Sequence, residues 1–218
     1  MESKQQKQFV KSVEQQCSRS VEISNFSNVF EAFKRNYKLV PLEVFGKNPY
    51  KTLISTILSS RTKDEITLEA SLRLFAKAPN FRKLEQLDEL EIKKLIFPVG
   101  FYKTKAKHLK AIAGLHHVIV PKTREDLMKL PGVGRKTANL VLNRAFGIPA
   151  IAVDTHVHRI CNALGWVKTK TPQQTEKKLI KIIPKRYWPD LNRLFVSIGR
   201  QYTTKRKLEE FLKNEKLI

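Results

Sequence analysis

The sequence predicts an all-α fold of about ten helices, and three observations lead to this prediction. From about residue 25 onward, apolar residues recur at spacings of three and four, which is the pattern of helices with one buried face. Alternation of apolar and polar residues is scarce, and no two such runs are joined by a hairpin turn. Short segments that contain Gly, Pro or Asn separate the periodic stretches, as connections between helices do.

The predicted helices follow one another from that point to the end of the chain. Residues 1–20 precede them, and because they are rich in Gln, Lys and Ser with few apolar anchors, we expect a mobile basic arm or a short extra helix there. The breaks between helices fall at residues 46–49, 78–80, 98–100, 131–132 and 147–149. The helical spacing is carried by Leu53, Ile54, Ile57 and Leu58, by Leu68, Leu72 and Phe75, by Leu90, Leu95 and Ile96, by Ala106, Leu109, Ala113 and Leu115, and by Leu179, Ile182 and Ile183.

The composition excludes several classes of protein. The 218 residues carry 42 Lys and Arg against 20 Asp and Glu, a formal net charge of +22, which predicts a polyanionic partner such as duplex DNA or RNA. Two cysteines, Cys17 and Cys161, are too few for a disulfide framework or for a four-cysteine metal site, and the five histidines form no metal-binding pattern. Because no apolar run is long enough to span a bilayer and residues 1–20 contain no secretory signal, we expect an intracellular protein that does not contact membranes.

The segment 124–147 carries the most informative pattern in the chain. Leu127 and Leu130 give a short helix its apolar face, the sequence Pro-Gly-Val-Gly at 131–134 makes a tight turn, and a second helix begins at Arg135. Glycine accepts the positive φ values of such turns and lets the backbone approach a ligand closely. The segment therefore predicts two helices joined by a narrow glycine turn.

This predicted hairpin is expected to bind an anion. The first turn of a helix points free N–H groups and the positive end of the helix dipole outward, so one phosphate of a nucleic acid backbone would fit there without its sequence being read. The alternative is an ordinary connection whose glycines only cap a helix, and the full pattern on a chain of this charge favours DNA-backbone binding. The expected contacts come from Gly132, Val133, Gly134 and Arg135.

Lys136 and Asp154 are the candidate catalytic residues. Lys136 falls in the first turn of the second helix, where the helix dipole and Arg135 disfavour its ammonium form, and a neutral amine could attack a sugar C1′ and form a Schiff base. The alternative is a solvated lysine that contacts a phosphate. Asp154 ends a short apolar run before the next predicted helix, where Asp is a favoured N-cap. Ionised beside a DNA sugar, Asp154 would stabilise positive charge at C1′ and orient or deprotonate Lys136.

At these residues the sequence resembles a known family. LPGVGRKTAN at 130–139 and VDTHVHRICN at 153–162 are similar to two motifs of the endonuclease III branch of the helix-hairpin-helix DNA glycosylases, and the similarity covers roughly residues 40–202. In that family the lysine that matches Lys136 is the Schiff-base nucleophile, and the acid that matches Asp154 is the catalytic carboxylate.

The resemblance implies two helical domains with a DNA-binding cleft between them. One domain would span residues 44–148 and contain the helix-hairpin-helix at 123–147. The second would combine residues 21–43 with 149–218, and the basic arm would stay outside both. A damaged base would be flipped out of the DNA stack into the cleft, where Lys136 and Asp154 meet from opposite sides.

The resemblance also implies two loops that fill the gap left by the flipped nucleotide. Residues 57–64 (ILSSRTKD) resemble the loop that plugs this gap, with Arg61 inside it. Residues 99–106 (VGFYKTKA) resemble a second wedge loop, with Phe101 at the apolar inserting position. Arg61, Phe101 and Lys105 are therefore expected DNA contacts. Without the resemblance, Phe101 would be a packing aromatic and Arg61 a surface charge.

The sequence departs from the family in two places. Many members carry a four-cysteine [4Fe–4S] loop near the C-terminus, whereas this chain reads TTKRKLEEFLKNEKLI after Tyr202, so we expect no cluster and a basic tail packed in its place. Arg61 stands where bacterial relatives commonly have Gln, and an arginine can donate two hydrogen bonds to the edge of a guanine. Our hypothesis is that Arg61 contacts the orphaned base and favours lesions opposite guanine.

Three functions remain open, of which the first is favoured. It is a base-excision-repair DNA glycosylase with abasic-site lyase activity, in which Lys136 displaces a damaged pyrimidine and the resulting imine permits β-elimination. The second is a uracil or thymine mismatch glycosylase that acts opposite guanine, with water as the attacking group. The third is a non-catalytic helix-hairpin-helix DNA-binding module, which would need neither Lys136 nor Asp154. The expected partner is double-stranded DNA with a damaged base or abasic site, bound by a monomer in the cytoplasm and nucleoid or in a nucleus.

Overall fold

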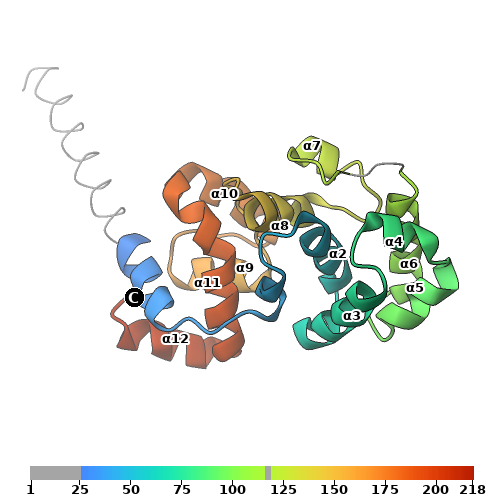
Figure 1. The fold of residues 1–218 in the computed structure, drawn as a ribbon. Helices are drawn as coiled ribbons and strands as arrows, with labels where there is room; N and C mark the ends of the chain where they lie inside the picture. Colours follow the sequence, from blue (N-terminus) through green and yellow to red (C-terminus); the bar gives the residue numbers. More distant parts are fainter. Residues whose placement is uncertain (1–25, 116–118) are drawn as a thin grey trace, which may run out of the picture.

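The computed structural model describes residues 26–115 and 119–218, and every regular element in these two ranges is helical (Figure 1). This confirms the all-α prediction, while the predicted arm at 1–20, with Cys17, lies outside the described residues. In the same two ranges, none of the helices has the length and apolar character needed to cross a membrane. Residues 26–35 are helical, and the later elements are η1 (Pro41–Phe45), α2 (Pro49–Ser59), α3 (Asp64–Lys77), α4 (Phe81–Gln86), α5 (Glu89–Ile96), α6 (Tyr102–Ala113), α7 (Arg124–Leu127), α8 (Arg135–Phe146), α9 (Thr155–Ala163), α10 (Pro172–Ile182), η2 (Lys185–Tyr187), α11 (Trp188–Gln201) and α12 (Lys205–Asn214).

Side-chain caps determine where most of these helices begin. In seven of them the residue before the first turn accepts a hydrogen bond from a backbone N–H, and these residues are Asn48, Asn80, Asp88, Thr123, Asp154, Thr171 and Thr204. The start of α8 differs, because its N-cap is Gly134, which has no side chain to accept such a bond. The N–H groups in the first turn of α8 are therefore left for a ligand.

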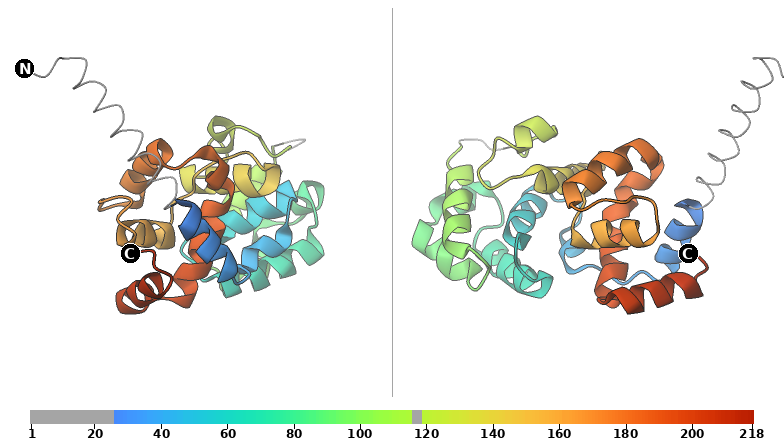
Figure 2. Two further views of the ribbon diagram at one scale, coloured as in Figure 1. Left: turned by 90° about the vertical axis from the view of Figure 1, so that its left-hand side faces the viewer. Right: turned by 180° about the vertical axis from the view of Figure 1, so that it is seen from behind.

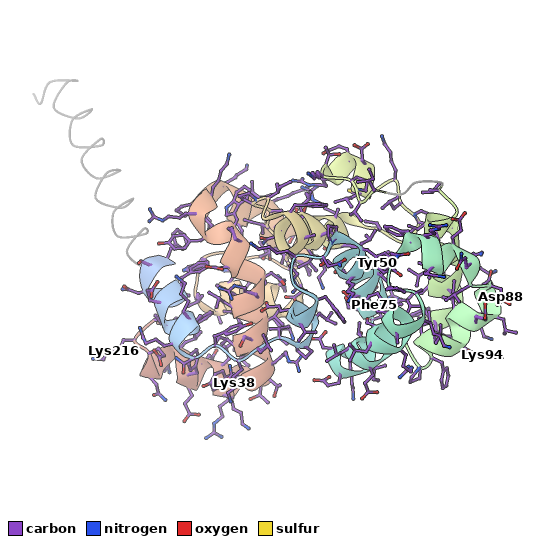
Figure 3. The ribbon with its side chains drawn as sticks, in the orientation of Figure 1. Lys38, Tyr50, Phe75, Asp88, Lys94 and Lys216 are labelled. Atoms are coloured by element: carbon purple, nitrogen blue, oxygen red, sulfur yellow. The ribbon has the colours of Figure 1, made fainter. Side chains whose placement is uncertain are left out.

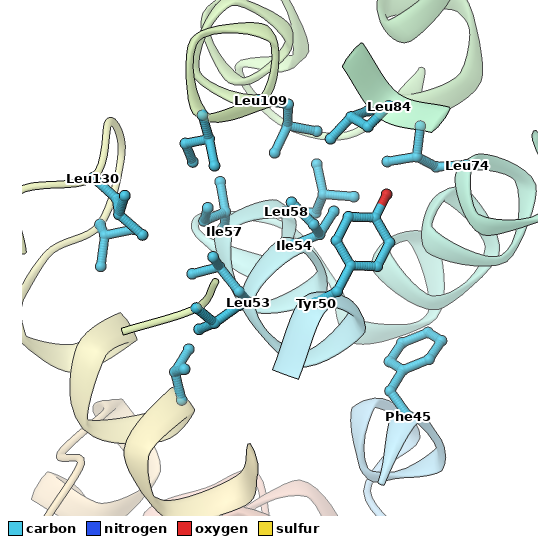
Figure 4. Packing of buried hydrophobic residues seen from close by; sticks show 14 of the residues in the cluster. Phe45, Tyr50, Leu53, Ile54, Ile57, Leu58, Leu74, Leu84, Leu109 and Leu130 are labelled. Carbon is cyan, nitrogen blue, oxygen red and sulfur yellow. The ribbon is translucent and has the colours of Figure 1, made fainter. Parts of the chain in front are cut away.

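The first of two hydrophobic clusters surrounds α2 (Figure 4). Residues 52–58 are all buried, because α3, α6 and α8 pack around this helix. The cluster extends from η1 to α8 and includes Leu109 of α6 and Leu130 of the hairpin. Tyr50 and Phe75, labelled in Figure 3, pack with their ring centroids 5.6 Å apart. Full burial of a side chain such as Leu109 contributes about 1.5–3 kcal/mol to the free energy of unfolding.

The second cluster joins the helical residues 26–35 to α9, α10, α11 and α12, so segments from the two ends of the described chain lie side by side (Figures 1 and 2). Phe33 packs on Phe195 of α11 and Phe211 of α12, at centroid distances of 4.8 and 6.0 Å. Phe211 also stacks on Tyr202 at 4.3 Å. The tail is thus a helix whose apolar face is buried against this cluster, while its Lys and Arg side chains are exposed.

The chain passes from the first cluster to the second between Ala150 and Ile151, which belong to different clusters. Arg200 of α11 connects the two parts, because its guanidinium lies 2.5 Å from a carboxylate oxygen of Asp64 and 2.5 Å from one of Glu65, at the start of α3. We propose that the two clusters are the cores of the two domains that the family resemblance implies.

Candidate active site

The turn between α7 and α8 has a shape that depends on glycine. Leu130 and Val133 anchor the turn because both side chains are buried in the first cluster. Gly132 has a φ of +77°, and a Cβ at this position would lie only 2.5 Å from Nδ1 of His108. Gly134 has a φ of −93° and open space around the position of a Cβ. Glycine is therefore required at the first of these two positions, and the second leaves the start of α8 accessible.

Lys136 and Asp154 lie on the wall of one cavity. Lys136 is exposed in the first turn of α8. Asp154 is partly buried at the end of the buried segment 150–153, and its Oδ1 accepts a hydrogen bond from the backbone N of Val157 at 2.8 Å. Both side chains line a cavity of about 670 Å³ whose walls come from the connection between α2 and α3, from α8, and from the beginnings of α9 and α10 together with α11. The cavity thus lies between the two hydrophobic clusters.

A second cavity, of about 410 Å³, runs from Lys136 along the hairpin. It shares Lys136, Leu140 and Arg61 with the larger cavity, and it is also lined by Gly132 and Gly134. Lys136 consequently stands where a groove beside the expected phosphate site opens into the cavity that holds Asp154.

The two expected wedge loops lie together. Arg61 and Phe101 are both exposed and both adopt left-handed backbone conformations, with φ values of 52° and 57°. The guanidinium carbon of Arg61 lies 5.3 Å from the centroid of the Phe101 ring, within the range of a cation–π contact. The backbone N of Gly100 donates to Oγ1 of Thr62 at 3.1 Å, and a Cβ on Gly100 would lie 2.5 Å from the carbonyl oxygen of Arg61. The two loops are therefore joined to each other, and together they expose a cation and an aromatic ring.

Lys105 is buried, which contradicts the expectation that it contacts DNA directly. Its exposed fraction is 6%, and its Nζ donates hydrogen bonds to the carbonyl oxygens of Leu58 at 2.7 Å and Ser60 at 2.5 Å and to Oγ1 of Thr62 at 3.2 Å. Burial lowers the pKa of Lys105 to about 8. Because these three acceptors end α2 and begin the Arg61 loop, Lys105 holds the two wedge loops together from the inside.

Arg135 has a partner that sequence reasoning missed. Its Nε donates to Oε1 of Glu176 at 2.6 Å, and Glu176, on α10, is only 6% exposed. The Nδ2 of Asn139 lies 3.4 Å from the same oxygen. Glu176 thus ties the first turn of α8 to the second cluster. Glu176 lies in a run of polar residues, 173–178, and no local pattern in the sequence distinguishes it from a solvated glutamate.

Two histidines of the second motif have structural partners. His156 lines the large cavity, and its ring packs so closely on α11 that a Cβ on Gly199 would lie 2.3 Å from its Nδ1. Burial lowers the pKa of His156, while the nearby Asp154 raises it, and burial is the larger effect. Nδ1 of His158 forms a hydrogen bond with Oγ1 of Thr175 at 2.6 Å. Within residues 26–115 and 119–218 no three His, Cys, Asp or Glu side chains are grouped as metal ligands.

The residues of this chain do not fit a [4Fe–4S] cluster. Such a cluster is held by four thiolates, whereas the whole sequence has two cysteines. Cys161 is fully buried in α9, where burial raises the pKa of its thiol. The segment that follows Tyr202 forms α12, whose residues Leu208, Phe211 and Leu212 are buried.

The helical fold and this site together define a class: a helix-hairpin-helix protein with an open cavity that presents a lysine from the hairpin helix and a capping aspartate. The chain belongs to the HhH-GPD superfamily of base excision DNA repair proteins, and this family matches residues 54–185.

Relatives and solved structures agree with this assignment. The chain is 43% identical to Endonuclease III of Thermotoga maritima over 177 residues, which cover 79% of this chain and 80% of the relative. It is 41% identical to Endonuclease III-like protein 1 of Gallus gallus over 70% of this chain, but it spans only 57% of that protein's length. A structure of a trapped Endonuclease III-DNA covalent intermediate is similar with a TM-score of 0.68 and 36% identity, covering 73% of this chain and 77% of the other.

Proposed function

We propose that this protein is a base-excision-repair DNA glycosylase with abasic-site lyase activity, which removes damaged pyrimidines from double-stranded DNA. The observation that supports this proposal most directly is the position of Lys136 and Asp154 on one cavity wall, beside a hairpin that is open to a phosphate. A module that only binds the DNA backbone would need neither side chain. The Endonuclease III relatives and the structure described as a trapped covalent intermediate with DNA support the same reaction class.

Lys136 would supply the nucleophile of this reaction. Its neutral Nζ attacks C1′ of the damaged nucleotide, the bond between C1′ and the base breaks, and the base leaves with the electron pair and takes up a proton. Nζ then loses a proton and the bond between C1′ and O4′ breaks, with O4′ taking up a proton, so the sugar ring opens and a protonated imine forms between Nζ and C1′. The imine makes the proton on C2′ acidic, and its removal breaks the bond between C3′ and the 3′ oxygen, which nicks the strand.

Asp154 would act on charge and on protons at the same place. Its carboxylate is held by the backbone N of Val157 and faces the cavity that Lys136 lines. A fixed negative charge there stabilises the positive charge that develops at C1′ and accepts a proton from Lys136. We propose that the protein acts as a monomer. Because its partner is DNA, we also propose that it works in a nucleoid or a nucleus.

Borohydride trapping tests the role of Lys136. A duplex that contains dihydrouracil should give a covalent complex with the wild-type protein, and K136A should abolish it. K129A is the matched control, because Lys129 lies on the same hairpin, is exposed and pairs with Asp126 at 2.7 Å. Base release without any trapped complex would instead favour attack by water, and neither base release nor trapping would favour a binding module.

The substitution D154N separates the charge of Asp154 from its capping role. Asn caps a helix about as well as Asp, so the thermal midpoint should change little. The rate of base release should fall by about 10²–10⁴-fold, because the developing charge at C1′ loses its counterion. A D154N protein that keeps the wild-type rate would remove Asp154 from the mechanism.

A mismatch activity opposite guanine is the second candidate, and the position of Arg61 favours it. Arg61 is exposed at the tip of the paired loops, where its two guanidinium edges can reach an orphaned base. Rates for one lesion placed opposite each of the four bases, in wild type and in R61Q, test this idea. We expect a preference for guanine that R61Q reduces by about 5–150-fold, corresponding to a bidentate contact of about 1–3 kcal/mol. An unchanged preference would reject the role of Arg61.

A further inference from the structure

Arg144 is a cation on the same face of α8 as Lys136. Lys136, Leu140 and Arg144 follow one another at intervals of four residues, and all three line the cavity of about 670 Å³. Eight residues of α-helix advance by about 12 Å, so one nucleotide could contact both long side chains at once. Arg144 also lines a neighbouring cavity of about 280 Å³, so it forms part of the partition between the two.

The guanidinium of Arg144 is held by a buried amide. Its Nη2 donates to Oδ1 of Asn192 at 3.1 Å, and Nδ2 of Asn192 donates to the carbonyl oxygen of Ala152 at 3.1 Å. Asn192 is 4% exposed, and Ala152 belongs to the segment that leads to Asp154. This chain of hydrogen bonds fixes the orientation of Arg144 relative to Asp154.

The remaining donors of Arg144 are free to meet a ligand. Among the residues that the structure describes, its Nε and Nη1 form no hydrogen bond and no carboxylate pairs with it at ion-pair distance. Nε and Nη1 have no partner, yet neither of them is fully enclosed by protein atoms. Both are therefore accessible from the cavities that Arg144 lines. A desolvated cation without an ion-pair partner is costly for a fold, and a ligand with oxygen acceptors removes that cost.

The charges around Arg144 favour a neutral or partly negative ligand group. Burial lowers the pKa of Arg144, whereas Glu43, Asp64, Asp154 and Tyr37 raise it, and the side chain remains a cation at any physiological pH. These acids are near enough to act electrostatically without forming an ion pair. The guanidinium is therefore stabilised in the cavity while its Nε and Nη1 donors stay unused.

We propose that Arg144 is the base-contacting residue of this cavity, donating a hydrogen bond from Nη1 to a ring carbonyl oxygen of the flipped pyrimidine. This inference rests on the proposed glycosylase function and specifies its substrate class, namely bases with a ring carbonyl. As the bond to C1′ breaks, negative charge spreads onto the carbonyl oxygens of the departing base. The contact with Arg144 strengthens at that moment, so it accelerates base release rather than only binding the substrate.

Two substrates distinguish this role from a structural one. The first is a duplex with dihydrouracil opposite guanine, which requires base release, and the second is the same duplex with a preformed abasic site, which has no base to contact. Single-turnover rates on both should be measured for wild type, R144Q and R144K. R193Q is the matched control, because Arg193 lines only the smaller cavity and pairs with Asp190.

The expected result is a change in the ratio of the two rates. R144Q should slow base release on the order of 100-fold, as loss of an oxyanion donor does, while incision of the abasic duplex changes by less than about threefold. R144K keeps the charge without the planar guanidinium that orients this donor, and it should restore only part of the ratio. R193Q should keep the wild-type ratio.

Other outcomes overturn the inference. Equal losses on both substrates would show that Arg144 supports only the fold, and an unchanged rate on dihydrouracil would show that it does not contact the base. If R144Q fails to fold, which its thermal midpoint would show, R144K tests the proposal in its place. If R144K keeps the wild-type ratio of base release to abasic-site incision, the proposal is rejected. A wild-type protein that incises neither duplex would refute the glycosylase function itself, which is a separate result.

Discussion

The hairpin and the paired wedge loops meet the same backbone requirement in different ways. In the hairpin the left-handed conformation falls on Gly132, a residue that adopts it without strain. In the loops it falls on Arg61 and Phe101, whose side chains make it cost about 1–2 kcal/mol per residue. The conformation of the hairpin is thus set by its residue type, whereas that of the loops is set by tertiary contacts.

Tertiary contacts keep Arg61 and Phe101 in their left-handed conformations. Lys105 donates to three oxygens at the end of α2 and in the Arg61 loop, and Gly100 approaches the Arg61 carbonyl so closely that no larger residue fits. The strained residues are also the two that present a cation and an aromatic ring to solvent. Backbone strain is typical of functional loops, and we propose that it keeps these two side chains oriented for contact with DNA. Four substitutions test this difference.

The largest effect is expected from G132A. An alanine there would adopt an unfavourable φ of +77° and place its Cβ 2.5 Å from the His108 ring, so the free energy of unfolding should fall by about 2–4 kcal/mol. G134A is the control, since its φ is −93° and nothing lies within 4 Å of the new Cβ. Urea denaturation of both variants measures the difference. Equal losses would mean that the turn does not depend on the first glycine.

A smaller, pH-dependent effect is expected from K105M. Burial lowers the pKa of Lys105 from 10.5 to about 8, so the folded chain releases this proton at a lower pH than the unfolded chain. The unfolded state therefore binds more protons between these two values, and stability from this group must rise with pH across that window. The free energy of unfolding of wild type minus that of K105M should increase on the order of 1–3 kcal/mol from pH 7.5 to 10.5.

The control for this measurement is K103M, because Lys103 lies on the same helix and is exposed. The free energy of unfolding of wild type minus that of K103M should not change across the same pH window. A flat difference for K105M as well would show that Lys105 keeps its ordinary pKa, and that the loops are held by an ammonium group at every pH in the range.

Local patterns predicted the hairpin and the cap at Asp154, because a glycine turn, a helix start and a capping residue are fixed by neighbours in sequence. Lys105 was misjudged because its three acceptors lie 43 to 47 residues earlier in the chain, and nothing next to it marks it as buried. Arg144 was missed although its spacing from Lys136 was visible. Its orientation depends on Asn192, 48 residues away, which only the folded structure brings near.

The smallest change in stability is expected from R61G and F101G. Each relieves about 1–2 kcal/mol of backbone strain, but each also raises the entropy of the unfolded chain by about 0.4–1 kcal/mol and removes a cation–π contact of about 0.5–1 kcal/mol. The free energy of unfolding should therefore stay within about 1 kcal/mol of wild type. Base release from a dihydrouracil duplex should nevertheless fall by about tenfold or more, because each variant removes one of the two side chains at this tip and leaves the loop more flexible. If release keeps its wild-type rate in both variants, the strain at this tip serves no function, and the contrast with the hairpin is one of packing alone.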